Sequence, residues 1–591
     1  MPSPPTSRPA SVEASARIEA QRTRITELEA ALWEGGLNES VLEDYQAAFR
    51  ELEGLLEALP EDRRHHFLIV IPVADSPQQL SSCLESLLTL CRSYGYGGLD
   101  RGRYRKVSVL LADDSANAEL IVRNREIARD FERSGIATHY FGIDEQLTLM
   151  RRLAALGLER IVGRHSPQSF GHKGQAMMRN IAYLKLAEMQ SGMTAERVLF
   201  YTIDADQEFK VKVATAQGGR SLYAVNFLYQ LDRIFDQTDA RVLTGKVVGD
   251  PPVSPAVMAA NFLDDVIAFV GEMAASDPAR CYRQPGAETS GSGEAAYHDM
   301  ADMFGFKAGE EAYRYRCSLE GTPDNIACFD DFSKRLNRFF HGEHPTRITW
   351  YRYQSVADSV EPARTVYTGN YVFSSDALEW FIPFAPLRLR MSGPTMGRLL
   401  KSVIGDGFVS ANLPMLHSRT LESTGQSEFR PGVVSEQHKV DLCDEFERQF
   451  YGDVMLFSIE RLARQGFPDG LLPEGLVAET LDSIYAEMRE KYLARQRLIL
   501  GRLDQLRALL HAERQWWNHS DGNAPALSRF ENFTQNVASN FAEGSPCSTR
   551  IDGPASWEVW RKRQLNAIDG LAADRQAWLL ALSTLGIPGP G

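Results

Sequence analysis

Three almost wholly apolar runs in the first half of the chain restrict its fold more than any other feature. They are FLIVIPV at 67–73, VSVLLA at 107–112 and VLFYTI at 198–203. Such runs, rich in β-branched residues, are typical of strands buried on both faces of a parallel sheet. Helical patterns separate them, which predicts strand–helix units with right-handed crossovers and therefore a doubly wound, mostly parallel α/β sheet.

Charge and cysteine content exclude several classes of protein. The 591 residues include 64 Lys and Arg against 78 Asp and Glu, a formal net charge of −14, which argues against a nucleic-acid or anionic-membrane partner. The seven cysteines are scattered without a C-x-x-C pair, which favours reduced thiols over a zinc site or a disulfide framework. No uncharged stretch reaches the ~18–20 residues of a membrane span, and the first residues have no signal-peptide core. We therefore expect a soluble, cytoplasmic protein.

Helical patterns occupy both ends of the chain. The first is broken at Gly35-Gly36, which predicts a helical hairpin that docks on the next domain or, alternatively, forms a partner-binding coiled coil. The last includes a stripe from Leu476 to about Trp517, longer than a typical domain is wide. It must pack on the N-terminal hairpin or on a second subunit, and we favour a homodimer. The expected units are a helical segment at 1–62, an α/β domain at 63–432 and a helical domain at 433–591.

Aspartates follow each of the three apolar runs. Ligands of doubly wound sheets bind beyond the carboxyl ends of the strands, so these positions are candidates for a site. After the third run, Asp204-Ala205-Asp206 presents two carboxylates that a turn can aim at Mg²⁺ or Mn²⁺, and such a cation can bridge a diphosphate. The alternative is a pair of solvated turn carboxylates. The aspartates at the three strand ends are Asp75, Asp113, Asp114, Asp204 and Asp206.

The second strand end has two interpretations. An ionised Asp113 only accepts hydrogen bonds, so it suits the imide N–H of uracil or a comparable donor of a nucleobase. Alternatively, Asp114 or Ser115 caps the helix that follows by accepting hydrogen bonds from its open N–H groups. The two roles are compatible, with Asp113 reading the base and its neighbour capping the helix.

A glycine-bearing basic segment at 163–180 precedes another predicted helix. Lys173 and Arg179, together with the N–H groups at the start of that helix, suit an anionic phosphate. The alternative is an ordinary surface loop. Asn180 in the same segment reads as a structural residue.

Four motifs in order along the chain resemble the family 2 glycosyltransferases and their relatives with the GT-A fold. FLIVIPVADSPQQLSSCLESLL resembles the first strand and helix of that family, LLADDSA its D-D-x-S strand end, GQAMMRNIA its R-N segment and YTIDAD its D-x-D metal motif. The resemblance covers Phe67–Asp206, with a looser continuation to about Arg419. It implies a GT-A core with Mn²⁺ or Mg²⁺ and a nucleotide-diphosphate sugar, bound near Pro72, Asp75, Asp113, Asp114, Lys173, Arg179 and Asp204.

The continuation departs from the family where a base is expected. TVYTGNYVFSSDAL at 365–378 resembles the acceptor-side strand, where Tyr367, Asn370 and Tyr371 would face sugar or acceptor. Many inverting relatives then carry an E-D pair that supplies the base, but 390–400 has no carboxylate. The base is then another residue, for which Asp376, Glu379 and Asp406 are the candidates, or the reaction retains configuration.

The resemblance also implies a third metal ligand. In several metal-dependent relatives a His at the place of His417 completes the site, so Asp204, Asp206 and His417 would form a mixed oxygen and nitrogen set. A second pair, His341 and His344, has no strand end to fix it and reads as structural. Three arginines indicate an anionic acceptor: Arg388, Arg390 and Arg398. Alternatively, Arg398 is a residue of a helix surface.

We therefore predict a metal-dependent glycosyltransferase that moves a sugar from a nucleotide-diphosphate sugar to a small-molecule or glycan acceptor, with Asp206 holding the cation most directly. The missing E-D pair leaves a catalytically silent scaffold as an alternative. A nucleotidyltransferase is a further alternative, although it usually needs a glycine-rich basic loop after the first strand, and VADSPQQ is neither.

Overall fold

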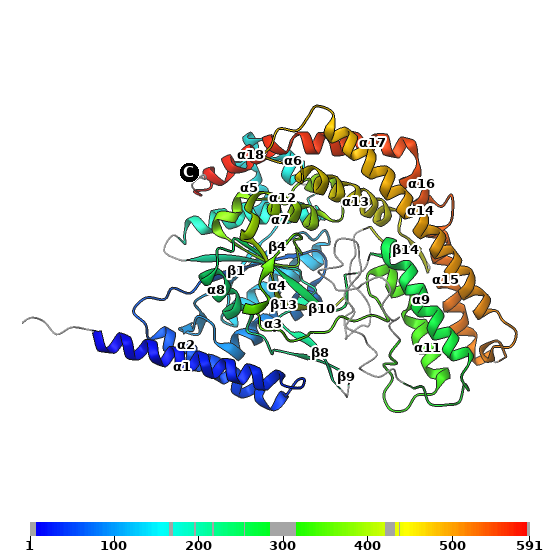
Figure 1. Ribbon diagram of the computed structural model, residues 1–591, viewed down its shortest axis with the longest axis horizontal. Helices are drawn as coiled ribbons and strands as arrows, with labels where there is room; N and C mark the ends of the chain where they lie inside the picture. The colour runs from blue at the N-terminus through cyan, green and yellow to red at the C-terminus, as the bar shows by residue number, and fades with distance from the viewer. Residues whose placement is uncertain are drawn as a thin grey trace, which may run out of the picture.

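The computed structural model describes residues 8–164, 170–193, 197–215, 218–252, 254–283, 315–419, 432–436, 438–519 and 521–587. A nine-stranded sheet lies at its centre, with helices on both faces and a long helical layer to one side (Figure 1). The strand order is β11-β13-β10-β12-β6-β1-β4-β5, and β7 pairs with β13. The strands are β1 (His66–Val73), β4 (Val107–Asp113), β5 (Ala137–Phe141), β6 (Val198–Ile203), β7 (Gln207–Glu208), β10 (Val242–Gly249), β11 (Glu361–Pro362), β12 (Asn370–Ser374) and β13 (Phe408–His417).

Most of the long strands run parallel, as the apolar runs predicted. β1 pairs in parallel with β4 on one side and with β6 on the other, while β10 and β13 are parallel to each other. β12 is antiparallel to both of its neighbours, β6 and β10. The prediction of a mostly parallel α/β sheet with helical additions is confirmed. Within the segment 365–378, which resembles the acceptor-side strand of the family, only Asn370–Ser374 pairs within the sheet.

Side chains of β1 alternate between two hydrophobic cores. Phe67, Ile69 and Ile71 belong to the core on one face, whereas Leu68 and Val70 belong to the core on the other. The first face is covered by α1 (Arg8–Trp33), α2 (Leu42–Glu57), α3 (Pro77–Tyr94), α4 (Ala118–Arg133) and α8 (Phe227–Gln237). The second is covered by α5 (Ile143–Arg152), α6 (Glu159–Val162), α7 (Gln175–Ser191) and α12 (Ser392–Ile404). β1 is therefore buried on both sides, which explains its continuous apolar sequence.

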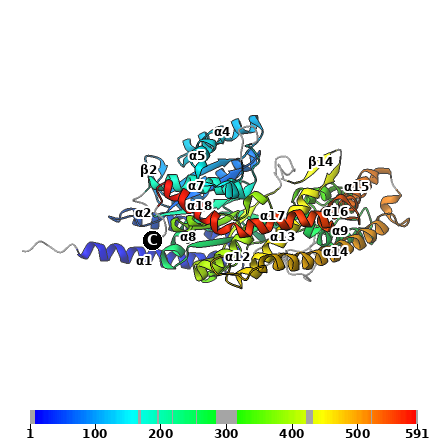
Figure 2. The same ribbon diagram turned by 90° about the horizontal axis from the view of Figure 1, so that it is seen from above.

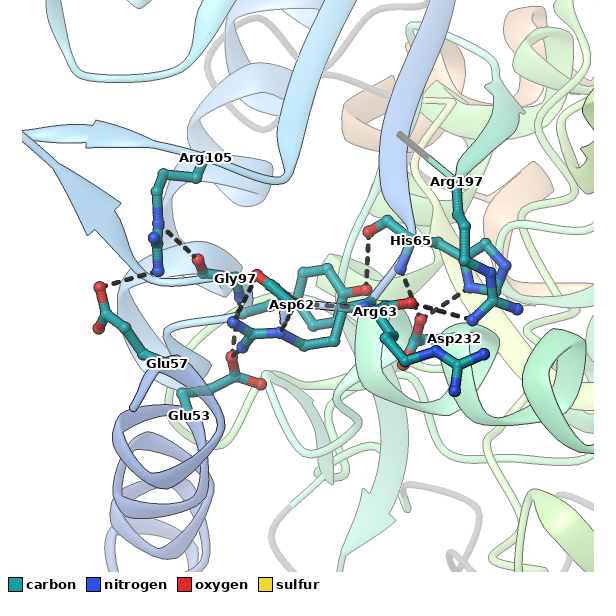
Figure 3. A network of polar contacts seen from close by, with 11 residues as sticks. Glu53, Glu57, Asp62, Arg63, His65, Gly97, Arg105, Arg197 and Asp232 are labelled. Atoms are coloured by element: carbon teal, nitrogen blue, oxygen red, sulfur yellow. Dashed lines mark hydrogen bonds and ion pairs between the residues drawn. The ribbon is translucent and has the colours of Figure 1, made fainter. Parts of the chain in front are cut away.

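The predicted N-terminal hairpin is present and docks on the first face. α1 packs on α2, and α2 packs on α3. A buried polar network joins α2 to the start of β1 (Figure 3): Glu53 pairs with Arg64 and accepts a 2.8 Å hydrogen bond from the Gly97 N–H. Beside it, His65 Nδ1 lies 2.8 Å from an Asp232 carboxylate oxygen on α8. The hairpin is thus tied to the sheet by charge as well as by apolar contact.

The helical layer contains a segment that the sequence analysis did not assign to it. The unassigned segment holds α9 (Pro255–Ala274) and α11 (Asn325–Arg335). The rest of the layer consists of α13 (Cys443–Ala463), α14 (Leu476–Leu510), α15 (Ala524–Phe541), α16 (Pro546–Asp552), α17 (Pro554–Asp569) and α18 (Leu571–Thr584). The mid-chain helix α9 packs along α14, and α11 packs on α15. The Trp516 indole N–H donates to the Met273 carbonyl at 2.9 Å, which joins the end of this layer to α9.

This packing corrects the expected role of the long helix. α14 ends at Leu510, and its buried stripe from Leu481 to Leu510 contacts α9, α13, α15 and α17 of the same chain. Leu498, which lies within α14, is 44% exposed and is therefore not part of the buried stripe. Figures 1 and 2 show α1 and α15 at opposite ends of the molecule. The chain's own helices cover the stripe, so it gives no reason to expect a second subunit.

Three short antiparallel pairs complete the described structure. They are β2 (Leu99–Asp100) with β3 (Arg103–Tyr104), β8 (Val211–Thr215) with β9 (Gly218–Leu222), and β14 (Val434–Glu436) with β15 (Lys439–Asp441). The Gly/Ser/Glu-rich stretch at 286–294, a composition typical of a loop, lies outside the described residues. Among the helices that the structure describes, none combines the length and the apolar character needed to cross a membrane.

A partly buried carboxyl on α1 makes the hairpin sensitive to pH. Burial raises the pKa of Glu29 from 4.5 to about 7. Because the pKa is higher in the folded chain, this group's contribution to stability is fully present below pH 4.5 and is lost as the pH rises through about 7. We expect Glu29→Gln to remove this loss, which is at most about 3 kcal/mol.

The measurement is the free energy of unfolding in urea at about pH 5 and about pH 8 for the wild type and for Glu29→Gln. Glu27→Gln, on the exposed side of the same helix, is the matched control and should keep the wild-type pH dependence. Equal pH dependence in all three proteins would contradict the assignment.

Candidate functional site

The carboxyl ends of the parallel strands meet at one edge of the sheet. The α3 crossover leads from β1 to β4 on one side of β1, whereas α7 leads to β6 on the other side. A crevice is expected at such a switch point, here between the ends of β1 and β6. Pairing between β1 and β6 stops at Val70 and Thr202, whereas Pro72 lies further along β1 and still pairs with Ala112 of β4. His417 ends β13 at the same edge.

The two D-x-D carboxylates differ in their bonding, and Asp206 is the one with an oxygen atom available to an added ligand. Its Oδ2 atom lies 3.2 Å from His417 Nε2 and 3.1 Å from Arg419 Nη1. Its Oδ1 atom is buried and has no hydrogen-bond partner among the described residues. Although burial alone would raise the pKa of Asp206, His417 and Arg419 hold it well below its usual value. Asp206 is therefore a half-buried carboxylate with one buried, uncommitted oxygen.

His417 is held in place from both of its ring nitrogens. Nδ1 lies 2.6 Å from the Asp250 carbonyl oxygen, so this nitrogen carries a proton and donates it. Burial alone would lower the pKa of His417, but Asp206 raises it to about 9. The backbone hydrogen bond aims Nε2 at Asp206, an orientation typical of imidazole ligands of metals.

Asp204 is paired differently from Asp206. Its Oδ1 atom forms an ion pair with Nη2 of Arg179, a side chain with no exposed surface. Nε and Nη1 of Arg179 are buried and have no hydrogen-bond partner among the described residues. Burial raises the pKa of Asp204, against the opposing effect of Arg179. The backbone N–H of Asp204 donates to Gln207 Oε1 at 3.1 Å, which fixes the turn.

The expected metal ligands come together in part. The ligand atoms of Asp204, Asp206 and His417, all of which the structure describes, do not all lie within 4.8 Å of one another. Asp206 and His417 do form a close pair, and carboxylate oxygen with imidazole nitrogen suits Mn²⁺ or Mg²⁺. The buried, unpaired Asp206 Oδ1 is the observation that fits a cation here. Asp204 would join the set only by loosening its pair with Arg179.

The start of α7 is occupied by a protein carboxylate. Asp114 accepts hydrogen bonds from the backbone N–H groups of Lys173 and Gly174, both at 3.1 Å, and forms a 2.6 Å ion pair with Lys173 Nζ. Lys173 Nζ also donates to the Phe170 carbonyl at 2.6 Å. Burial lowers the pKa of Lys173, and Asp114 opposes this shift. The groups expected to bind phosphate thus bind Asp114, and a phosphate role for Lys173 stays a prediction that requires this pair to open.

Asp113 lies at the expected strand end, and both of its oxygens already accept hydrogen bonds. Oδ1 accepts from the Ser115 N–H at 2.9 Å, while Oδ2 accepts from the Tyr140 hydroxyl at 2.7 Å and from Asn124 at 3.2 Å. Asn117 caps α4, with its side chain accepting from the first turn. The helix cap is therefore Asn117, and the expectation that Asp114 or Ser115 caps α4 is wrong. Recognition of a base by Asp113 remains a prediction.

Two residues in the left-handed backbone region contact each other just beyond the end of β1. Asp75 has φ 52° and His172 has φ 51°, and His172 Nε2 lies 2.7 Å from an Asp75 carboxylate oxygen. The other Asp75 oxygen accepts from the N–H groups of Ala116 and Asn117. Non-glycine residues in this region are strained, and such strain is typical of functional sites.

The structure does not bring the expected bases to this site. Asp376 follows Ser374, which pairs with Leu199 at the start of β6, so it lies at the amino edge of the parallel strands. Asp406 precedes β13 and lies at the same amino edge. The length of β12 alone separates the two edges by about 14 Å. We therefore withdraw the expectation that Asp376 or Asp406 is the base. Glu379, paired with Arg241, lies at that edge as well.

Other residues with expected roles contact neighbouring parts of the protein. Asn370 Nδ2 donates to the carbonyls of Lys246 and Leu413, which ties β12 to β10 and β13. Asn180 bridges the backbone of Ile161 and Ile382, as predicted for a structural residue. The remaining ones are Tyr367, which accepts from Gln207; Tyr371, which is buried; Arg388, whose carbonyl accepts from Arg448; Arg390, paired with Glu445; Arg398, paired with Glu460; His341, beside Ser435; and His344, beside Thr346.

Two residues of the site were missed by the sequence analysis. Asp250 follows β10 and accepts the Arg419 N–H at 2.7 Å on its carboxylate. The strand-end argument that selected Asp206 applies to it too, but Gly245 and Lys246 interrupt the apolar run of β10 and hid that strand. Arg419 follows His417 by two residues, and only the fold shows that it reaches Asp206.

Comparisons with known proteins give distant likenesses only. No family model and no curated protein matches the chain. Among solved structures, mannosyltransferase PcManGT from Pyrobaculum calidifontis, in complex with GDP-Man and Mn²⁺, is 9% identical with a TM-score of 0.30; the match covers 92% of this chain and 99% of that one. Mouse xyloside xylosyltransferase 1, in its apo form, is 11% identical with a TM-score of 0.19, over 59% and 78% of the two chains. Likenesses of this size carry no conclusion about activity.

A glycine beside Asp204 allows the carboxylate to sit where it does. A Cβ atom at Gly369 would lie 2.6 Å from Asp204 Oδ2 and 3.0 Å from the Tyr367 ring. We expect Gly369→Ala to destabilise the fold by about 1–3 kcal/mol, the usual cost of overpacking. The measurement is the free energy of unfolding.

Gly271→Ala on α9 is the matched control, because no atom beyond its own helix lies within 4 Å of the added Cβ. Alanine there should stabilise the helix by about 0.5–1 kcal/mol. If Gly369→Ala behaves like this control, the close packing around Asp204 is wrong.

Proposed function

We propose that the protein is a metal-dependent glycosyltransferase that uses a nucleotide-diphosphate sugar. The observation that carries this proposal is the uncommitted Asp206 Oδ1, buried beside His417 at the end of the crevice between β1 and β6. A buried carboxylate oxygen without a partner is costly, and a divalent cation is a ligand that would satisfy it. The D-x-D motif resembles that of family 2 glycosyltransferases, and its position at a strand end agrees with that resemblance.

Asp206 and His417 would hold the cation, and Asp204 is the third candidate ligand. When bound, the cation supplies positive charge that stabilises a diphosphate leaving group. Arg179 and Arg419 balance the charges of Asp204 and Asp206 in the protein as it stands. If a cation and an anionic diphosphate bind together, the total charge of the site stays close to neutral, and the two guanidinium groups become available to phosphate oxygens.

The nucleoside would lie toward the ends of β1 and β4. Asp75 and His172 form one wall there, and Asp113 lies at the end of β4. A carboxylate that already accepts from Tyr140 and Ser115 still has lone pairs for a donor on a base. Bound in this direction, the diphosphate would extend from the β1 end toward the metal ligands after β6.

A catalytically silent scaffold is the second candidate. Both D-x-D carboxylates are paired with arginines, and the three carboxylates expected as bases lie at the other edge of the sheet. A silent domain should bind neither Mn²⁺ nor a nucleoside diphosphate. Calorimetric titration with nucleoside diphosphates, with and without Mn²⁺, separates the two candidates.

Replacement of Asp206 tests the metal assignment. We expect Asp206→Asn to reduce hydrolysis of a panel of nucleotide sugars by at least about 100-fold, because a neutral amide stabilises a cation far less than a carboxylate does. Asp406→Asn, a carboxylate of the opposite edge, should retain wild-type turnover. Near wild-type turnover of Asp206→Asn in Mn²⁺ would disprove the assignment, provided that both variants unfold like the wild type.

Replacement of Asp113 tests the direction of the nucleotide. Asp113→Ala should weaken binding of a nucleoside diphosphate by roughly 1–3 kcal/mol, the range for a buried donor left unpaired. Tyr140→Phe removes a protein hydrogen bond from the same carboxylate and should leave nucleotide affinity unchanged. An unchanged dissociation constant in Asp113→Ala would show that Asp113 only organises the strand end.

A further inference from the structure

Two buried cysteines from distant parts of the chain meet in the helical layer. Cys443 is the first residue of α13, and Cys547 is the second residue of α16. Their sulfur atoms lie 3.0 Å apart, and both side chains are buried. The 104 positions between them gave no spacing signal, so the sequence analysis counted both as isolated thiols.

Oxygen donors converge on the same two sulfurs. The carboxylate of Asp441, the last residue of β15, lies with both sulfurs in a group whose ligand atoms are all within 4.8 Å of one another. Asn540 Oδ1, on α15, lies 3.3 Å from Cys547 Sγ. It also accepts the Leu442 N–H at 2.8 Å, which fixes the amide so that its oxygen faces the sulfur. Three donor atoms thus lie close to one another, and a fourth lies beside one of the two sulfurs.

We propose that Asp441, Cys443 and Cys547 bind a divalent cation of the Zn²⁺ class, with Asn540 or water as the fourth ligand. Two thiolates with oxygen donors suit Zn²⁺ and disfavour Mg²⁺ or Mn²⁺, because thiolates are soft ligands that these harder cations bind poorly. At Zn–S distances of about 2.3 Å, tetrahedral ligands place the two sulfurs about 3.8 Å apart, so they need to separate by less than 1 Å.

Converging oxygen donors separate this site from a simple disulfide pair. A disulfide requires the sulfurs to close to about 2.05 Å and makes no use of a carboxylate or an amide oxygen. Here the Asp441 carboxylate also accepts the Cys443 N–H at 2.8 Å, which holds it beside the thiols. An oxygen ligand fixed in this way is expected at a metal site.

Proton release balances the charge when the cation binds. Burial raises the pKa of Cys443 and of Cys547. Cysteine binds a metal as the thiolate, so Zn²⁺ binding would displace the proton of each thiol. Arg550 lies near enough to lower the pKa of Asp441 and of both thiols, so it offsets the remaining negative charge.

A bound cation would connect segments that lie far apart in the sequence. It would join the β15 end and the α13 start to α16 and, through Asn540, to α15. Such a site stabilises the helical layer and takes no part in the reaction proposed for Asp206. Its test is therefore independent of the proposed function.

The test uses the full chain, reduced and stripped of metal with a chelator. Titration with Co²⁺ should produce the near-ultraviolet charge-transfer band of cobalt thiolates, and titration with Zn²⁺ should remove it. Cys443→Ser and Cys547→Ser should each abolish the band and weaken Zn²⁺ binding by more than about 100-fold, since loss of an outer-shell partner alone costs 10–100-fold. Asp441→Asn should keep the band and weaken Zn²⁺ binding by about 10–100-fold.

Two control variants separate this site from other metal binding. Cys281→Ser removes an exposed cysteine elsewhere and should leave both readouts unchanged. Asp206→Asn should also leave the cobalt thiolate band intact, since that site contains no sulfur. Asp441 is exposed, so Asp441→Asn should fold even if a cysteine variant does not. In that case the Zn²⁺ affinity of Asp441→Asn tests the proposal.

Three results would overturn the proposal. The first is a wild-type chain without the cobalt thiolate band. The second is a band that persists in Cys547→Ser. The third is a Cys443–Cys547 disulfide, detected by mass spectrometry, in a chain that binds no Zn²⁺ after reduction.

Discussion

The burial of β1 on both faces is the constraint on which the rest of the structure depends. A strand with apolar side chains on both sides needs a helix layer on each face and a parallel partner on each edge. β4 and β6 supply the partners, and the crossovers through α3 and α7 supply helices. Because parallel strands start and end at the same edges, this one strand also fixes where Asp75, Asp113 and Asp204 gather.

Those parts of the structure that follow from strand burial were predictable from the sequence. The buried strands and the helices between them follow from the spacing of apolar residues along the chain. The position of the aspartates at one edge follows from the order of these strands and helices. Pairing choices among charged side chains were not predictable. Lys173 and the N–H groups before α7 can bind any anion, and only the fold shows that Asp114 is the anion that reaches them.

Two further features could not be predicted from the sequence: the direction of a strand, and the packing partner of a helix within the α/β segment. Asp376 follows a strand in the sequence just as Asp206 does, but β12 runs antiparallel, so the residue after it emerges at the opposite edge. The apolar pattern of a strand does not state its direction. α9 reads as one more helix of the α/β domain, and nothing in its sequence reveals that its partner is α14.

The contact between α9 and α14 has a consequence for how the chain folds during synthesis. These helices are separated by roughly 200 residues, so their packing has a high contact order and must wait for the later helix. At about 5–20 residues per second, α14 follows α9 from the ribosome by roughly 10–40 s. For that time the largely apolar surface of α9 lacks its native cover, and a chain stopped between the two helices would keep it exposed to aggregation or to chaperones.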